Sequence, residues 1–108
     1  MKSWLAILGI GEDGVEGLSS AARTLLETAT LVVGGARHLA LAAPLLRGAQ
    51  LAWPSPLQDA FPAVLARRGQ PVVVLASGDP YCYGIARTLH AVVPVEETVC
   101  IPVPSALS

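Results

Sequence analysis

The residues best suited to chemistry follow the apolar run Val72–Ala76, in a segment with the sequence SGDPYCYG. The run predicts a strand buried on both faces and therefore a parallel sheet. In such a sheet, ligands bind just beyond the carboxyl ends of the strands. Gly78 would let the backbone approach a ligand closely, Asp79 would supply a hydrogen-bond acceptor, and Pro80 would constrain the turn. The alternative is an ordinary turn, because Gly-Asp-Pro is also common turn chemistry.

A second glycine-rich segment, Gly9–Gly14, has the sequence GIGEDG. Its G-x-G-x-x-G pattern is typical of dinucleotide-binding loops, in which pyrophosphate lies at a helix amino terminus. Two features disagree with that interpretation. The expected helix cap, Ser19 or Ser20, comes several residues too late, and the carboxylates of Glu12 and Asp13 would repel phosphate. An acidic, glycine-rich loop better suits a ligand with positive charge, such as the sulfonium of S-adenosylmethionine.

Composition narrows the class of protein. The 108 residues suffice for one domain, and 53% of them are hydrophobic while 14% are charged, which predicts a large core. A net charge of −1 and scattered basic residues argue against a nucleic-acid surface. No apolar run approaches the ~18 residues of a membrane helix. The start, MKSWLAILGIG, lacks the cleavage site of a signal peptide, so we expect a cytoplasmic protein without membrane partners.

The two cysteines, Cys82 and Cys100, lack the CxxC spacing of zinc and redox sites. In a cytoplasmic chain they are expected to be reduced, small and buried. His38 and His90 add too few ligands for a metal site, so we expect no metal. Both histidines are interpreted as helix-surface or packing residues.

Apolar strands alternate with helical patterns along the whole chain. A helix capped by Ser19 or Ser20 would place Ala22, Leu26 and neighbouring apolar residues on one face. This alternation predicts βαβ units with right-handed crossovers and an α/β fold. The expected strands are Trp4–Ile10, Leu31–Val33, Gln50–Trp53, Pro71–Ala76 and Thr98–Ile101; the remaining expected helices are Arg37–Leu46, Leu57–Arg68 and Ile85–Val92.

The chain ends with the sequence IPVPSALS, which places Ser105 just after the fifth expected strand. A helix cap followed by a helix is expected at that point. We therefore expect residues 1–108 to be the first part of a larger protein.

Four separated segments carry a resemblance to a known family: GIGEDGVEGLS, VVGGARHL, VLASGDPYCYGIARTL and IPVPSALS. In order and spacing they are similar to those of the tetrapyrrole (corrin and porphyrin) methylases. The chain most resembles the members that methylate C5 of a corrin precursor in cobalamin biosynthesis. The resemblance implies a three-layer α/β domain, with helices on both faces of a five-stranded, mostly parallel sheet. It further implies the amino-terminal domain of a two-domain, homodimeric methyltransferase that binds S-adenosylmethionine between its domains.

The resemblance also assigns site residues. Gly14 and Asp13 match the loop that reaches the substrate, and Glu12 stands where many relatives have proline. Arg37 is a candidate for pairing with a substrate carboxylate, since arginine forms bidentate contacts with carboxylates; the alternative is an ordinary surface arginine. No catalytic base is assigned. The cofactor contacts implied are Gly11, Glu12, Ser77, Gly78, Asp79, Pro80, Tyr81, Cys82, Ser105 and Ala106.

Two other classes of function stay open from the residues alone. Gly9–Gly14 permits an NAD(P)- or nucleotide-binding module. The high apolar content permits a non-catalytic interaction domain within a larger assembly.

Overall fold

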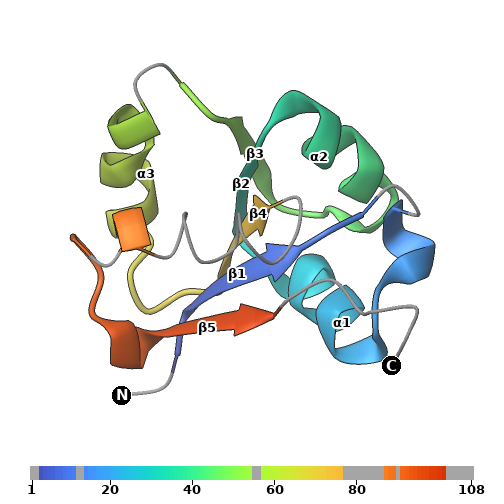
Figure 1. The fold of residues 1–108 in the computed structure, drawn as a ribbon, viewed down its shortest axis with the longest axis horizontal. Coiled ribbons are helices and arrows are strands. Elements are labelled where there is room, and N and C mark those ends of the chain that lie inside the picture. Colours follow the sequence, from blue (N-terminus) through green and yellow to red (C-terminus); the bar gives the residue numbers. More distant parts are fainter. Residues whose placement is uncertain (1–2, 12–13, 55–56, 77–86, 90, 102–108) are drawn as a thin grey trace.

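The computed structural model describes residues 3–11, 14–54, 57–76, 87–89 and 91–101. They contain a five-stranded sheet with the order β3-β2-β4-β1-β5 (Figure 1). Every strand pairing is parallel, which confirms the expected parallel sheet. The strands are β1 (Leu5–Gly9), β2 (Leu31–Gly34), β3 (Ala49–Ala52), β4 (Val72–Ala76) and β5 (Thr98–Ile101).

Helices cover both faces of the sheet, and right-handed crossovers explain which helix lies on which face. The chain steps from β1 past β4 to β2 and then β3, and afterwards returns to β4 and passes β1 to reach β5. A right-handed connection that crosses the sheet in one direction lies on one face, and a right-handed connection that crosses in the other direction lies on the opposite face. Accordingly α1 (Ser20–Thr28) and α2 (Ala36–Ala42) pack on one face, while α3 (Phe61–Leu65) and Leu89 pack on the other.

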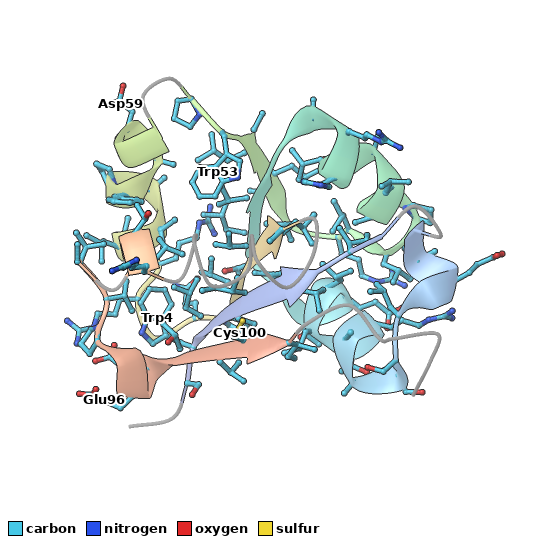
Figure 2. The ribbon with its side chains drawn as sticks, viewed as in Figure 1. Trp4, Trp53, Asp59, Glu96 and Cys100 are labelled. Atoms are coloured by element: carbon cyan, nitrogen blue, oxygen red, sulfur yellow. The ribbon has the colours of Figure 1, made fainter. Side chains whose placement is uncertain are left out.

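The alternating direction of side chains along β1 and β4 divides the core in two. Leu5 and Ile7 of β1 pack on the α3 side, whereas Ala6 and Leu8 pack on the α1 and α2 side. All residues of β1 and β4 are buried, as expected for continuous apolar runs covered on both faces. Trp53, which follows β3, fills space between α3 and the sheet (Figure 2).

The first helix forms as its sequence predicts. The Ser19 hydroxyl accepts a hydrogen bond from the amide of Ala22 at 3.2 Å and caps α1. Ala22 and Leu26 are buried against the sheet.

The second and third helices are shorter than predicted. α2 ends at Ala42, and a 3-10 turn over Ala43–Leu45 follows, because Pro44 cannot continue the α-helical hydrogen bonding. The expected helix Leu57–Arg68 is divided into a 3-10 segment (Leu57–Ala60) and α3. Pro62 then lies in the first turn of α3, where its missing amide hydrogen costs least.

A polar cluster joins distant parts of the chain at the amino-terminal edge of the sheet. Glu97 is only 5% exposed. Its carboxylate accepts hydrogen bonds from Trp4 Nε1 at 2.6 Å and from Arg68 Nε and a terminal guanidinium nitrogen at 3.1 and 2.7 Å. The Arg68 hydrogen bond, followed by that of Trp4, lowers the pKa of Glu97. No pattern in the sequence predicted this cluster.

Cys100 differs from expectation. It lies on β5 (Figure 2), is exposed rather than buried, and is disulfide-bonded rather than reduced. Its exposure follows from the position of β5 at the edge of the sheet, where Val99 is also 41% exposed. Cys82 lies outside the described residues.

Among the residues that the structure describes, no helix is both long enough and apolar enough to span a bilayer.

Candidate functional site

The topology itself marks a candidate site at the carboxyl ends of β1 and β4. These strands are neighbours, yet the segment after β1 leads to α1 on one face and the segment after β4 leads to Leu89 on the other. In open parallel sheets, ligands bind at such a reversal, because diverging connections leave a crevice between the strand ends. Both glycine-rich motifs of the sequence begin here.

The register places the two motifs side by side. Gly9, the last residue of β1, pairs with Ala76, the last residue of β4. The amide of Ile10 donates to the carbonyl of Ala76 at 2.8 Å, so the chains remain together for one more residue. On the other side of β1, Leu8 pairs with Ile101 at the end of β5. The strands that precede three of the four family motifs therefore end at one edge, next to each other.

Backbone geometry explains the glycine that closes the first loop. The amide of Gly14 donates to the carbonyl of Gly11 at 2.9 Å, which forms a tight turn. Gly14 has φ +61°, in the left-handed region that favours glycine. It is buried against Leu41 of α2 and begins a 3-10 segment (Gly14–Gly17). The turn thus brings the loop back onto the α2 side of the sheet.

The same geometry disagrees with a dinucleotide-binding fingerprint. In that motif the third glycine lies in the first helix, whereas here Gly14 lies in a 3-10 segment and α1 begins at Ser20. The classical dinucleotide-binding sheet also places β1 beside β2, and here β4 separates them.

The fourth motif follows β2, which lies on the other side of β4 from β1. Gly34 packs so tightly against β4 that a Cβ atom there would lie 3.0 Å from the Cβ of Leu75. Arg37 is exposed and His38 is half-buried in the first turn of α2. Burial, and then the charge of Arg37, lower the pKa of His38, so the imidazole is neutral at pH 7.

The structure places Gly11, Gly14 and Arg37 beyond the carboxyl ends of β1 and β2, and their binding of cofactor or substrate stays a prediction. The other predicted contacts lie outside the described residues: Glu12, Asp13, Ser77, Gly78, Asp79, Pro80, Tyr81, Cys82, Ser105 and Ala106. His90 also lies outside them. Within the described part of the chain, no three His, Cys, Asp or Glu residues gather as metal ligands would.

An apolar hollow of about 540 Å³ lies at the opposite edge of the sheet, lined partly by Trp4, Ala6, Leu25, Pro71 and Val99. It is distant from the chain reversal and from the glycine-rich motifs. Sheet topology places ligands of open parallel sheets at the other end of the strands.

Comparison with known proteins identifies the family of the chain. The model of the family described as Tetrapyrrole (Corrin/Porphyrin) Methylases matches residues 5–108. The chain belongs to the tetrapyrrole methylase family. The match spans both glycine-rich motifs and all five strands, so the α/β sheet with its 3-2-4-1-5 order is the tetrapyrrole methylase domain of this chain.

Individual curated relatives indicate a narrower group within this family. The chain is 49% identical over 108 residues to a precorrin-6Y C(5,15)-methyltransferase (decarboxylating) from Sinorhizobium sp, covering 100% of this chain and 26% of that protein. A protein of the same name from Mycobacterium tuberculosis is 36% identical over 106 residues, which are 96% of this chain and 26% of the relative. A cobalt-precorrin-7 C(5)-methyltransferase from Salmonella typhimurium is 35% identical over 95% of this chain and 51% of its own length. The chain therefore spans a quarter to a half of these methylases.

Proposed function

We propose that this tetrapyrrole methylase chain takes part in the S-adenosylmethionine-dependent methylation of C5 of a corrin precursor, precorrin-6Y, in cobalamin biosynthesis. The observation that carries the proposal is the chain reversal at the neighbouring carboxyl ends of β1 and β4, which end in register immediately before the two glycine-rich motifs continue. Two relatives of different length are both named as methyltransferases of C5, which supports C5 as the carbon that receives the methyl group.

The described residues at the carboxyl ends of β1 and β4 suit S-adenosylmethionine in their chemistry. They are glycine and apolar residues, and none of them carries a cationic side chain. Such a border suits a neutral adenosine and a positive sulfonium, and it lacks the charge that a pyrophosphate needs. The residues at this border are Gly9, Ile10, Gly11 and Ala76.

Methyl transfer depends mainly on the alignment of the methyl donor with the carbon that receives the methyl group. When bound, S-adenosylmethionine supplies a methyl group that a carbon nucleophile can take directly, with a neutral thioether as the leaving group. Holding two reactants in line can contribute about 7–11 kcal/mol to the lowering of the barrier. A tight glycine turn such as Gly11–Gly14 and a rigid parallel sheet serve that purpose, and no general base is required of this chain.

We further propose that residues 1–108 form the amino-terminal α/β domain of a two-domain, homodimeric enzyme. The second domain would supply the other wall of the cofactor cleft. The greater length of the relatives supports this division, since the Salmonella typhimurium protein is about twice as long as the matched region.

Calorimetry on the natural full-length polypeptide tests the proposed function. We expect S-adenosylmethionine to bind and NADPH to give no heat of binding, because the described border of the crevice carries no phosphate partner. Transfer of a labelled methyl group to a corrin precursor is the second measurement. Binding of NADPH alone would favour the nucleotide-binding module, and absence of binding by either cofactor would favour an interaction domain.

A further inference from the structure

Gly34, the last residue of β2, is a buried glycine whose backbone does not require glycine. Among the described residues, only Gly14 and Gly69 have a positive φ, so Gly34 lies outside the left-handed region. A glycine in a strand weakens it and often marks a close approach of two backbones. We propose that Gly34 is a positioning residue, which sets where the carboxyl end of β4 lies and thereby where residues 77–80 meet the methyl donor. This inference rests on the proposed function.

The contact that requires a glycine is the one with Leu75 of β4. In the register of β2 with β4, Val33 pairs with Val74, so Gly34 lies opposite Leu75. A Cβ atom on Gly34 would lie 3.0 Å from the Cβ of Leu75 and 3.4 Å from its Cδ1. Because a Cβ atom is bonded directly to the backbone, no rotation of the leucine side chain can move it away. An alanine at position 34 therefore displaces a strand backbone by a few tenths of an ångström.

Gly34 has neighbours on its other sides, so part of this displacement falls on β4. The carbonyl of Gly34 accepts a hydrogen bond from the amide of Trp53, just after β3, at 3.0 Å. The added Cβ atom would also lie 3.6 Å from the Cβ of His38 on α2. Since β3 and α2 limit the movement of β2, the end of β4 must move as well.

Movement of β4 at Leu75 reaches the beginning of both glycine-rich motifs. The next residue, Ala76, pairs with Gly9 at the end of β1, and its carbonyl accepts a hydrogen bond from the amide of Ile10 at 2.8 Å. Ala76 is also the residue directly before residues 77–80, which have the sequence SGDP. Gly34 therefore acts on the candidate site through β4 and needs no contact with a ligand of its own.

A displacement of this size is small for a fold and large for methyl transfer. Groups that align reactants must be held within about 0.5 Å of the productive geometry. A misplacement of about 1 Å can lower a rate about a hundredfold. On that scale, a few tenths of an ångström corresponds to about a three- to tenfold loss.

The test uses the natural full-length polypeptide with Gly34→Ala and two control variants. Gly35→Ala is the control for position, because its Cβ atom would meet only Nδ1 of His38, at an ordinary 3.6 Å. Gly69→Ala is the control for lost stability, because Gly69 has φ +88° and lies at the opposite edge of the sheet. We expect Gly34→Ala to lower the calorimetric affinity for S-adenosylmethionine and the rate of methyl transfer at saturating substrates, each about three- to tenfold. Both controls should match the wild type in these two measurements.

Melting temperatures of the three variants separate positioning from a purely structural role. Wild-type affinity and rate in a folded Gly34→Ala would overturn the inference and leave the methylase proposal standing. Equal losses in Gly34→Ala and Gly69→Ala, in step with their melting temperatures, would assign Gly34 to stability and also overturn it. Failure of Gly34→Ala to fold would do the same, because Gly34 would then be a requirement of the core. A wild-type protein that neither binds S-adenosylmethionine nor transfers a methyl group would overturn both proposals.

Discussion

At the scale of single residues, the carboxyl and amino ends of the strands carry different kinds of side chain. The carboxyl edge holds glycines, Arg37 and a half-buried imidazole, and the amino edge holds the Trp4–Glu97–Arg68 cluster. The cluster fastens the chain before β1 to the residue just before β5, because the amide of Trp4 also donates to the carbonyl of Glu97 at 3.0 Å. It therefore stabilises the sheet at the edge away from the site.

This cluster yields a prediction about acid stability. The folded-state pKa of Glu97 is lowered, chiefly by the hydrogen bond from Arg68, so its carboxylate stabilises the fold above the unfolded-state pKa of ~4.3. That contribution is lost as the pH falls through the lower, folded-state pKa. We expect Glu97→Gln to lower the melting temperature at pH 7 and to differ progressively less from the wild type below about pH 4.

The neighbouring Glu96 provides the control, because it is exposed (Figure 2). Melting curves of Glu96→Gln should follow the wild type at every pH. A Glu97→Gln variant whose deficit is the same at pH 7 and at pH 3 would show that the cluster stabilises through packing and that the charge of Glu97 contributes nothing.

At the scale of elements, local patterns predicted the strands well and the helix lengths less well. The fifth strand, Thr98–Ile101, has the expected bounds. Continuous apolar runs identify buried strands because both faces are covered. Helix ends depend on cap and proline geometry, and Pro44 and Pro62 shift them by several residues.

Local sequence patterns could not predict contacts between residues that are far apart in the chain. The partners Trp4 and Glu97 are 93 positions apart, and only the finished sheet order brings them together. The candidate site could be proposed from sequence without such contacts, since ligands bind beyond the carboxyl ends of the strands in parallel sheets. His38 is half-buried in the first turn of α2, and its interpretation as a helix-surface or packing residue stays a prediction.

Two left-handed glycines allow the role of the first loop to be tested at this scale. Gly14 (φ +61°) lies in the turn beside the crevice, and Gly69 (φ +88°) lies at the opposite edge, where an added Cβ would have no atom within 4 Å. Alanine at either position should cost about 1–2 kcal/mol of stability, the usual penalty for a left-handed alanine. Only Gly14→Ala should also weaken cofactor or corrin binding in the full-length polypeptide. Equal affinities in the two variants, measured by calorimetry, would remove the turn from the site.

At the scale of the whole molecule, the candidate site and an open apolar hollow lie at opposite ends of the same strands. The chain reversal between β1 and β4 lies at the carboxyl edge, and the hollow lies at the amino edge beside the exposed Val99. Helices bury both faces of a parallel sheet. An apolar hollow beside an edge strand leaves hydrophobic surface in contact with water, so covering it with another protein surface is favourable. Catalysis and assembly would therefore use different edges of one sheet.

This arrangement predicts how residues 1–108 behave alone. A small-molecule pocket usually buries about 70–90% of its ligand, and the contacts proposed here line only one wall. We expect the isolated 108 residues to bind S-adenosylmethionine much more weakly than the full-length polypeptide and to self-associate through apolar surface such as Val99. Calorimetry measures the first effect and sedimentation velocity the second.

Val99→Lys should reduce self-association without changing the melting temperature by more than a few degrees, because the side chain is already 41% exposed. A monomer that binds the cofactor as tightly as the full-length polypeptide would show a self-contained site and contradict the two-domain proposal.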